Sequence, residues 1–432
     1  MYACMLFVAE GLMIDRFHFH IPFKTECVSS VSACGEFGFV DLSAIYLPSL
    51  VCSITRDRDG ISSQTLSHPW ESLPSSYTPM AFKVFPGGPN YWPHVDIKAS
   101  PAKLLQGHNV YGPDDPALCG VELLTLLACS MPELFSMLDL RLTQIMNIDC
   151  TYSVPLGNEQ LALSVMQFLS NVENRHMKVS QALNSSCYWG KGSEHGHLKA
   201  YLKLLEMKYQ ISQLKKQNRH GCFDLVINTL SDEMLQDYAK DLLRLEAVLT
   251  KRKLKDLGVP TLFFDFCKYS KSLEAQNRNL IQELFMTKAA PLFEALEGAQ
   301  MNVYSDDEVR ERLKAKHGKY SEKTGKISYD AAMAAFRTYR AIAADGYHVT
   351  QEAMSRPTFY RHVKMICESG ISKAQLENLH DKKAKVIPLV RLIELDFSKQ
   401  YPDWYVEPVS QFDKVVEIPD YRLNKPALRL VS

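Results

Sequence analysis

The sequence predicts a chain of two parts, in which residues 1–300 combine strands and helices and residues 301–432 are mostly helical. Strand and helix signals alternate irregularly up to about residue 300, which favours an α+β or an α/β fold. The pattern then becomes mainly helical, so a boundary is expected near residue 300. A chain of 432 residues is also too long for one typical hydrophobic core.

The N-terminal third carries most of the strand signals. Residues that favour strands cluster between Gly-, Pro- and Ser-rich stretches and predict strands at 16–23, 38–47, 79–85 and 91–100. A helix is predicted at 117–139, where apolar side chains recur every three or four residues. A strand at 140–154 and a helix at 158–172 follow, with Asn158 as the N-cap.

The next elements are a predicted pair of strands at 185–190 and 196–206, followed by a polar, basic connection at 213–221. Residues 242–260 read as a strand that runs into a basic helix and stops near Gly258. Residues 260–300 are expected to be largely helical. Further helices are predicted at 306–319 and 328–346.

Composition excludes several classes of protein. Apolar residues make up 46% and charged residues 23%, as in soluble globular proteins. Lys+Arg and Asp+Glu are both 49, so an anionic partner must be met by local basic patches. The 11 cysteines form no CxxC pair, which argues against a disulfide framework or a zinc finger. Neither a signal peptide nor an apolar run of about 18 residues is evident, and a cytoplasmic protein is expected.

One apolar segment combines a tyrosine with a cation and a carboxylate. In AYLKLLE, Tyr201 is followed by Lys203 and Glu206. On a strand, Tyr201 and Lys203 would point the same way, and on a helix Lys203 and Glu206 would be neighbours. Either arrangement brings a cation near a phenol that is otherwise protonated at neutral pH, as phosphate chemistry at Tyr201 would require. The alternative is a core tyrosine flanked by solvated lysines.

Two His-x-His pairs are candidate metal ligands. HFH contains His18 and His20, and HGH contains His195 and His197. On a strand, residues two apart face the same side, as ligands of one divalent metal must. The glycine weakens a strand at the second pair. Exposed strand histidines are the alternative in both cases.

Four carboxylates lie inside apolar, strand-like segments: Asp96, Asp149, Glu206 and Glu246. Each must find a cationic partner or a metal, because burying an unpaired carboxylate is costly. Arg244 lies on the same predicted strand face as Glu246 and offers a structural alternative there. Carboxylate oxygens suit Mg²⁺ or Mn²⁺, the usual ions of phosphate chemistry.

Residues 350–372 fit a helix-turn-helix with its turn at 355–357. The residues expected to contact DNA are Arg356, Tyr360, Arg361 and Lys364. The apolar residues expected to face the core are Phe359, Val363, Ile366 and Ile371. An ordinary helical hairpin is the alternative reading of this pattern.

Nine blocks of the sequence follow one another in the order known from one family. They are MID (13–15), FVDLS (39–43), LSHPWESLP (66–74), KASPAKLLQGHNVYG (98–112), IDCTYS (148–153), AYLK (200–203), MNVYSDD (301–307), VIPLVR (386–391) and DFSKQYPDWYVEPV (396–409). Through them the chain resembles the gene II replication protein of filamentous bacteriophages, a rolling-circle initiator related to the HUH endonucleases.

The resemblance implies a nicking–joining enzyme that acts on the viral strand at the phage origin. Its tyrosine becomes joined to the 5′ phosphate, the free 3′-OH primes rolling-circle synthesis, and the displaced strand is later closed into a circle. The nucleophile of the AYLK block corresponds to Tyr201, with Lys203 placed to stabilise charge on phosphate or phenolate. The implied partners are double- and single-stranded origin DNA and the helicase and polymerase of the bacterial host, in whose cytoplasm the protein would act.

The resemblance also implies a divalent metal cofactor, Mg²⁺ or Mn²⁺. The HFH segment matches the His-hydrophobic-His pattern of the metal-binding motif of HUH enzymes. Related initiators with a tyrosine–lysine–glutamate block rely on carboxylates, which favours Asp149 and Glu206 as ligands. Asp96 and Glu246 are the second choices.

The resemblance refines the fold class and the boundaries. It implies an α+β nicking domain with an antiparallel sheet at 13–300 and a helical DNA-binding region at 301–432. Residues 1–12 precede the usual MID start and form an N-terminal extension, and the tail after about 409 lies beyond the resemblance. The family also makes a shorter protein from an internal start, here Met301. A non-catalytic DNA-binding regulator is the alternative function.

Overall fold

The computed structural model describes residues 12–31, 37–56, 62–157, 159–169, 179–183, 186–297, 306–321, 325–371, 373–377, 379 and 400–410. The chain divides into two compact units. Within the described residues, the first unit takes 12–163, 180–290 and 400–410, and the second takes 164–169, 179 and the described residues from 291 to 379. The division falls inside a helix, close to the boundary expected near residue 300.

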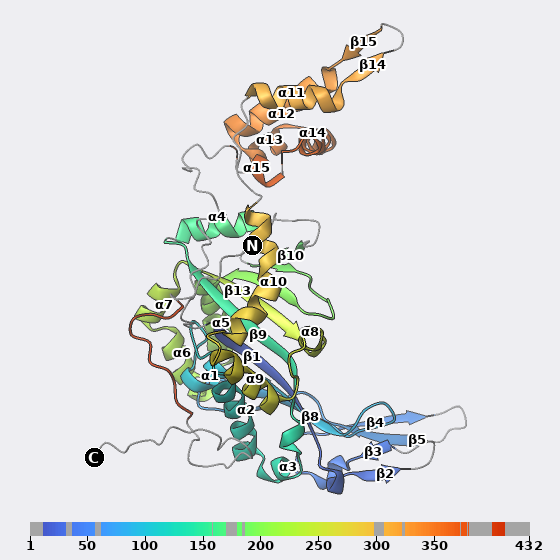
Figure 1. The fold of residues 1–432 in the computed structure, drawn as a ribbon, viewed down its shortest axis with the longest axis vertical. Coiled ribbons are helices and arrows are strands. Elements are labelled where there is room, and N and C mark those ends of the chain that lie inside the picture. Colours follow the sequence, from blue (N-terminus) through green and yellow to red (C-terminus); the bar gives the residue numbers. More distant parts are fainter. Residues whose placement is uncertain are drawn as a thin grey trace. The chain divides into compact units, whose positions relative to one another are not determined.

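A nine-stranded sheet is the centre of the first unit (Figure 1). Its strands, in spatial order, are β10 (Val179–Leu183), β11 (Ser186–Trp189), β12 (His197–Leu202), β13 (Leu242–Thr250), β9 (Gln144–Pro155), β1 (Met13–Pro22), β8 (His94–Ala99), β7 (Met80–Phe85) and β6 (Glu71–Leu73). The pairings from β11 across to β6 are antiparallel. The predicted α+β class with an antiparallel sheet is therefore confirmed.

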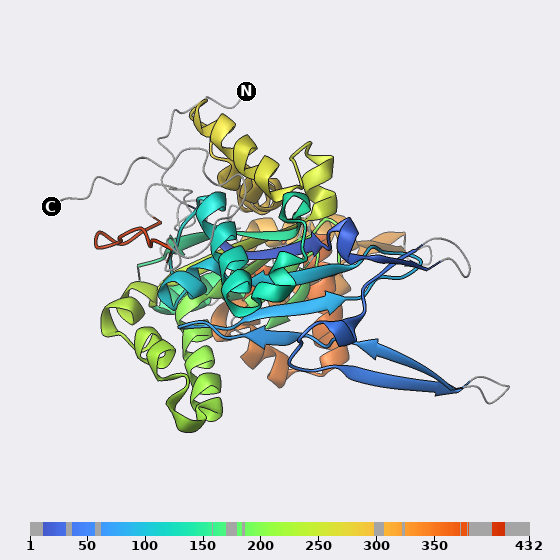
Figure 2. The ribbon, with the colours of Figure 1, turned by 90° about the horizontal axis from the view of Figure 1, so that it is seen from below.

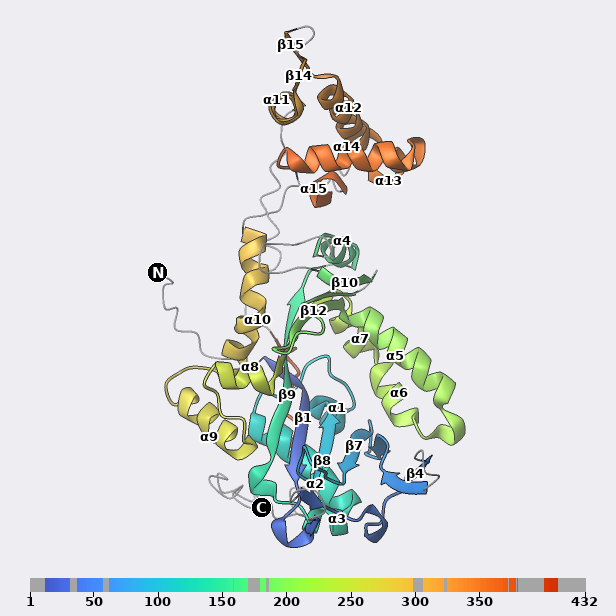
Figure 3. The same ribbon diagram turned by 90° about the vertical axis from the view of Figure 1, so that its right-hand side faces the viewer.

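The two faces of this sheet differ in chemistry because side chains alternate along each strand. On β1, Phe17 and Phe19 are buried and contact Phe263 of α9 (Phe263–Glu274), so this face carries the core. Figure 3 shows α9 and α10 (Leu280–Glu297) on one side of the sheet. The opposite face of β1 presents Arg16 and His18 to solvent in part. We call this second side the polar face, and such two-sidedness is typical of antiparallel sheets.

Eight further helices of the described chain belong to the first unit, one of them (159–169) only up to residue 163. They are α1 (Pro101–Gln106), α2 (Pro116–Ser130), α3 (Pro132–Ser136), α4 (Glu159–Leu169), α5 (Lys203–Gln217), α6 (Asp224–Leu230), α7 (Glu233–Ala239) and α8 (Lys251–Asp256). Helix α2 packs its Gly120 against Phe263, where a Cβ would lie 2.2 Å from the ring, so the glycine permits the close approach of α2 and α9.

Two short ribbons extend from the body of the first unit, as the blue strands in Figure 2 show. They are β2 (Ser29–Val31) with β3 (Phe37–Phe39), and β4 (Val51–Arg56) with β5 (Ser62–Ser67). All six residues of β4 are exposed. Of the strand predicted at 38–47, only residues 38 and 39 form a strand, because Asp41 caps a 3₁₀ turn at Leu42–Ala44 through the N–H of Ser43.

The second unit is built mainly from helices around its own core. Its elements are α11 (Asp306–His317), β14 (Lys319–Ser321), β15 (Lys326–Ser328), α12 (Asp330–Asp345), α13 (Tyr347–Ala353), α14 (Arg356–Glu368) and α15 (Lys373–Glu377). Core residues such as Val309, Phe336, Phe359 and Ile366 come from the helices of this unit. The mostly helical C-terminal region is thus confirmed, with one small hairpin in addition.

Residues 400–410 pack on the first unit, although the sequence prediction grouped them with the C-terminal region. The side chain of Gln400 accepts a hydrogen bond from the Ser153 N–H at 2.8 Å and donates one to the Ser153 carbonyl at 3.0 Å. The ring of Tyr405 lies 5.5 Å from that of Tyr111 and stacks on Tyr401. The last described segment therefore joins strand β9 and the loop after α1.

Among the described residues, no helix has the length and apolar character needed to cross a bilayer. The predictions for Asn158 and for Met301 fall outside the described residues, as do residues 1–11 of the predicted N-terminal extension 1–12 and all but residue 410 of the tail after about 409.

Candidate functional site

The candidate nucleophile lies at the junction of β12 and α5. Tyr201 is the penultimate residue of the strand, where it pairs with Ser186 on β11 and Arg244 on β13. Lys203 begins the helix, so Lys203 and Glu206 are neighbours one turn apart. The helical alternative therefore holds for Lys203 and Glu206, whereas Tyr201 and Lys203 do not share a strand, because the strand ends at Leu202.

Tyr201 is buried among ionic groups. The residue is 5% exposed, and the ammonium nitrogens of Lys199 and Lys203 lie 4.1 and 6.0 Å from the ring centroid. Burial, followed by the negative charge of Glu246, raises the pKa of Tyr201 well above its ordinary 10. The phenol is therefore protonated at neutral pH, and a positive charge beside it would be needed to stabilise a phenolate.

Lys203 is fully buried and makes two hydrogen bonds. Its Nζ donates to Asn109 Oδ1 at 2.8 Å and to Glu206 Oε2 at 2.6 Å. Burial lowers the pKa of Lys203 to about 8, although the charge of Glu206 opposes the shift. Burial alone would raise the pKa of Glu206, but Lys203 and Lys103 outweigh it and bring that pKa to about 2. The two side chains form an ion pair at neutral pH.

Asn109 connects this ion pair to the sheet. Its Nδ2 donates to Asp15 Oδ1 at 2.6 Å, and its carbonyl accepts from Arg244 Nη1 at 2.6 Å. Arg244 also donates to the carbonyl of Val110. Burial works to raise the pKa of Asp15, but the charges of Arg244 and Lys203 hold it below its ordinary value. The loop after α1 is thereby fastened to β1, β13 and α5.

Asp15 and Asn109 were not among the residues singled out from sequence. Asp15 follows three apolar residues and lies where the β1–β9 register shifts between Ile14 and Arg16. That pattern, an acidic residue in the MID block, was a usable signal. For Asn109 the sequence gives no such signal, because the residues around it do not indicate that its side-chain amide bridges two charged groups.

Asp149 is a second buried carboxylate of the polar face. It is 1% exposed on β9, opposite Arg16, whose Nη2 lies 2.5 Å from Asp149 Oδ2. Within the described part of the chain, neither of its oxygens accepts a well-aligned hydrogen bond. Burial and then the charge of Glu246 raise the pKa of Asp149 well above its ordinary value, against the effect of Arg16. A divalent cation would offset this repulsion.

The carboxylates predicted as metal ligands have different neighbours in the structure from those expected. Glu246 forms an ion pair with Lys199 at 3.3 Å, whereas Arg244 binds backbone carbonyls, so the predicted Arg244–Glu246 alternative does not form. Glu246 and Asp149 lie on neighbouring strands, and the charge of Glu246 acts on Asp149. In the described residues no interaction links Asp149 to Glu206, whose carboxylate faces Lys203 instead.

The HFH histidines lie on the polar face beside Asp96 of β8. His18 Nε2 lies 3.1 Å from Asp96 Oδ2, and His20 Nδ1 lies 3.3 Å from Asp96 Oδ1. His94, also on β8, places its Nε2 3.7 Å from Asp96 Oδ1. Donor atoms of His20, His94 and Asp96 all lie within 4.8 Å of one another, as ligands of one metal ion would.

The two histidines of HGH, His195 and His197, do not lie on the same face of one strand. Gly196 has a φ of +91°, and β12 begins only at His197, so His195 lies outside the strand. His195 instead lies 2.9 Å from Asp256. The hypothesis that His195 and His197 bind one metal through a strand is therefore wrong, because the glycine turns the chain between them.

The predicted DNA-contacting residues lie on the second unit. Arg356, Tyr360, Arg361 and Lys364 of α14 are all exposed. Phe359, Val363, Ile366 and Ile371 are buried, as predicted. Helix α14 begins at Arg356 with Ser355 at the N-cap, so Arg356 belongs to the first turn of the helix rather than to the preceding turn.

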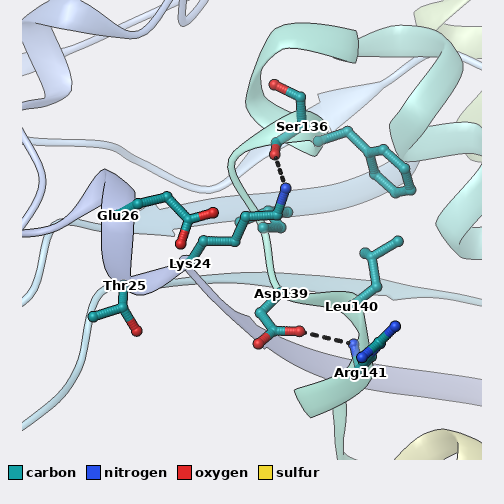
Figure 4. Close-up of a pocket in the computed structure, with 9 residues that line it drawn as sticks. Lys24, Thr25, Glu26, Ser136, Asp139, Leu140 and Arg141 are labelled. Carbon is teal, nitrogen blue, oxygen red and sulfur yellow. Dashed lines mark hydrogen bonds between the residues drawn. The ribbon is translucent and has the colours of Figure 1, made fainter. Parts of the chain in front are cut away.

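Two hollows lie away from Tyr201. One, of about 490 Å³, is shown in Figure 4; Lys24 donates to the Ser136 carbonyl there, and Asp139 accepts from the N–H of Arg141. None of the predicted catalytic residues lines it. The other, of about 510 Å³, is basic and is lined by His18, Met146, Asn147, Thr250, Lys251, Arg252 and Lys255. Its charge suits a phosphate group.

Comparison with known proteins places the chain among phage replication proteins. Residues 13–263 match the family model that describes the N-terminal part of the phage replication-associated protein, the gene II product. Residues 322–411 match the model of the C-terminal part of the same protein. No solved structure matches the chain.

The relatives are similar over nearly their whole length. The replication-associated protein of Salmonella phage IKe is 40% identical over 419 residues, which cover 93% of this chain and 98% of the relative. The replication-associated protein of Enterobacteria phage f1 is 39% identical over 408 residues, with 92% and 99% covered. The chain belongs to this family of gene II replication-associated proteins, as the blocks of sequence predicted.

Proposed function

We propose that this protein initiates and terminates rolling-circle replication of a filamentous phage genome by nicking and rejoining the viral strand through Tyr201. The observation that carries the proposal is the setting of that side chain, a buried phenol with the ammonium groups of Lys199 and Lys203 at 4.1 and 6.0 Å from its ring centroid. Carboxylates lie in the same network. Family membership supports a replication role for the chain.

In the proposed cleavage, the phenolic oxygen of Tyr201 attacks the scissile phosphorus. The bond from phosphorus to the 3′ oxygen breaks, the phenol loses its proton, and the departing 3′ oxygen gains one. The products are a 5′-phosphotyrosine ester and a free 3′-OH. Attack of a 3′-OH on that ester reverses the step and closes the circle without ATP, because the ester retains the phosphodiester energy.

Lys203 would act as a cation at this centre. Its ammonium is already held between Asn109 and Glu206, so it needs little reorganisation to stabilise charge that develops on phosphate or phenolate. Lys199, which lies closer to the ring, is a second cation with the same capability.

A divalent ion, Mg²⁺ or Mn²⁺, would complete the centre. Of the two predicted ligands we retain Asp149 and replace Glu206, which pairs with Lys203, by Glu246, whose charge acts directly on Asp149. Asp149 Oδ2 pairs with Arg16, but Oδ1 has no hydrogen-bond partner among the described residues and offers the oxygen ligand that such an ion prefers. When bound, the ion would polarise the scissile phosphate and offset its negative charge.

The proposed substrates are origin DNA in double- and single-stranded form. We assign duplex contacts to Arg356, Tyr360, Arg361 and Lys364 on the exposed side of α14, whose opposite side packs in the core. Host helicase and polymerase would take over at the free 3′-OH, in the cytoplasm of the infected bacterium. A shorter product starting at Met301 would regulate replication by binding single strands.

The test uses supercoiled plasmid that carries the cognate origin, with Mg²⁺ and the purified full-length protein. Tyr201→Phe is expected to bind the origin but to form neither nicked product nor covalent adduct. Tyr209→Phe is the matched control, because Tyr209 is 67% exposed on α5 and should retain full activity. A normal yield of adduct from Tyr201→Phe would refute the assignment.

The alternative function is a non-catalytic regulator, favoured by the exposed basic residues of α14. It predicts sequence-specific binding that resists EDTA, with no nick at any Mg²⁺ concentration. Relaxed DNA with protein attached to its 5′ end, mapped by mass spectrometry to the peptide containing Tyr201, would exclude that alternative.

A further inference from the structure

The basic hollow of about 510 Å³ takes no part in the proposed cleavage step. Three neighbouring strands of the polar face contribute to it, because His18 on β1 pairs with Asn147 on β9, which pairs with Thr250 on β13. Helix α8 begins directly after Thr250 and supplies the cationic side chains of the lining. The hollow therefore belongs to the same face of the sheet as Tyr201.

Two cations of the hollow lack a carboxylate partner. The ammonium of Lys251 donates a hydrogen bond to the side-chain oxygen of Gln144, and neither Lys251 nor Lys255 forms an ion pair with another described residue. Burial and then the positive charge of Lys255 lower the pKa of Lys251, so the two ammonium groups are close enough to repel each other. An anion bound between them would offset this repulsion.

The acidic residues beside the hollow are engaged elsewhere. Glu194 forms an ion pair with Arg252, and Asp256 lies 2.9 Å from the ring of His195. Arg252 is thus neutralised within the protein, whereas Lys251 and Lys255 keep their charge for a partner. The net positive charge of the hollow comes from these two lysines.

The lining also offers a surface for a base. Met146 and the imidazole of His18 line the hollow, and both side chains are partly exposed. A base can lie against such side chains only when it is unpaired, because a base inside a duplex is already stacked on its neighbours. A sphere of 510 Å³ would be roughly 10 Å across, less than the about 12 Å of the B-DNA major groove. Size and lining therefore favour an unpaired nucleotide over a duplex.

The hollow lies at a fixed distance from the proposed nucleophile. Tyr201 pairs with Arg244 on β13, and Thr250 ends the same strand. The interval from 244 to 250 spans roughly 20 Å, at about 3.3 Å per residue. A stacked strand rises about 3.4 Å per nucleotide, so about six nucleotides would connect the two points, and fewer in an extended strand.

We propose that this hollow binds one nucleotide of the single-stranded substrate, about six nucleotides or fewer from the bond that Tyr201 cleaves. Lys251 and Lys255 bind its phosphate, and His18 and Met146 contact its base. The inference rests on the proposed function and deepens it, because a second point of attachment sets which phosphate lies at Tyr201.

The test measures binding rather than cleavage. A fluorescent single strand that carries the cognate origin sequence is titrated with full-length Tyr201→Phe in EDTA, so that no strand is cut. Adding Lys255→Gln is expected to weaken binding at least about fivefold and to reduce the slope of log K against log salt by about 0.7, as for one lost phosphate contact. Lys271→Gln is the matched control, since Lys271 is an exposed lysine of α9 that does not line the hollow.

Neutral methylphosphonate linkages, placed singly along the strand, locate the contact. One position, about six nucleotides or fewer from the nick and on one side of it, should weaken binding when the hollow is intact. The same linkage should have no further effect in the double variant Lys251→Gln, Lys255→Gln. Equal melting temperatures of all variants show that each is folded.

Three results would overturn the proposal. The first is an unchanged affinity and salt slope in the double variant, and the second is a methylphosphonate effect that persists undiminished there at every position. The third is an equal loss of affinity for the duplex of the same sequence, which would assign the hollow to duplex DNA. Failure of the wild type to nick would refute the proposed function alone, because position-specific loss of binding would still support the hollow as a single-strand site.

Discussion

Lys203 has a structural role beside the chemical role proposed for it. Its ammonium is fully buried, yet it donates hydrogen bonds to two oxygens, and Glu206 supplies the counter-charge. Removing either oxygen would leave a buried charge unsatisfied, which costs several kcal/mol in typical proteins. The pKa of about 8 means that this buried ammonium is close to losing its proton in mildly alkaline solution.

The rate of nicking should therefore fall as the pH rises through about 8. Lys203 loses its positive charge above that value, and the decline should approach tenfold per pH unit. Single-turnover nicking measured from about pH 6.5 to about pH 10 tests this expectation.

Lys203→Arg is expected to abolish the alkaline fall, because a guanidinium stays charged, at a lower overall rate. Lys208→Arg, on the exposed side of α5, should keep the wild-type profile. A wild-type rate that increases through pH 8 would instead make the neutral amine the active form.

Asp149 leads to a second expectation, about stability without metal. Burial and Glu246 raise its pKa above the ordinary value, so the folded state binds more protons than the unfolded state between those two pKa values. Metal-free wild type should accordingly lose stability as the pH rises above about 4. Asp149→Asn removes the charge and should flatten this dependence, while it abolishes Mg²⁺-dependent nicking.

Urea unfolding in EDTA at about pH 4.5 and about pH 7 measures the difference. Asp237→Asn is the control, since its side chain is 80% exposed. Equal pH dependence of wild type and Asp149→Asn would contradict the electrostatic account.

At the scale of elements, the start of β12 determines where Tyr201 lies. Gly196 adopts a φ of +91°, and a Cβ there would lie 1.9 Å from the carbonyl oxygen of Val248. The glycine allows the chain to enter the strand against β13, which sets the register that pairs Tyr201 with Arg244.

Gly196→Ala should destabilise the protein by about 2 kcal/mol more than Gly192→Ala. Gly192 has a similar φ of +87°, but nothing lies within 4 Å of its Cβ position, so only backbone strain applies there. Guanidinium unfolding of the two variants gives the comparison. Equal losses would show that contact with Val248 does not restrict this position.

Much of the element pattern could be predicted from sequence, because it depends on local chemistry. The alternation in HVDIKA and the β-rich LRLEAVLT correspond to β8 and β13. The predicted helix at 117–139 is interrupted at Met131, where Pro132 starts α3 and leaves α2 to end at Ser130. The prediction of a strand and a connection in place of α5 is wrong, because tertiary contacts of Leu204 and Met207 decide that segment.

Only those residues of the candidate site that lie close together in the sequence could be predicted. Tyr201, Lys203 and Glu206 lie close together in the sequence and could be recognised as a group. Asp15 and Asn109 reach the same network from 94 residues apart, so their meeting depends on the strand order and on the loop that Arg244 holds. Spacing along the chain carries no information about such contacts.

At the scale of the whole molecule, the first unit is completed by the last described segment. Gln400 satisfies both backbone groups of Ser153 at the buried end of β9. Gln400→Ala should lower the free energy of unfolding by about 1–3 kcal/mol, because a buried N–H and carbonyl lose their partner. Val409→Ala, at a residue 78% exposed, should have little effect. Equal unfolding midpoints in urea would count against this role.

The packing of residues 400–410 on the first unit would have a regulatory consequence if the proposed shorter product from Met301 is made. A product that began at Met301 would contain this aromatic peptide but none of the strands that receive it. Each copy of such a product would carry a second copy of the segment 400–410, which could bind in place of the same segment of the full-length protein. Exchange between the two would let the ratio of long to short product, rather than any small-molecule signal, report how far infection has advanced.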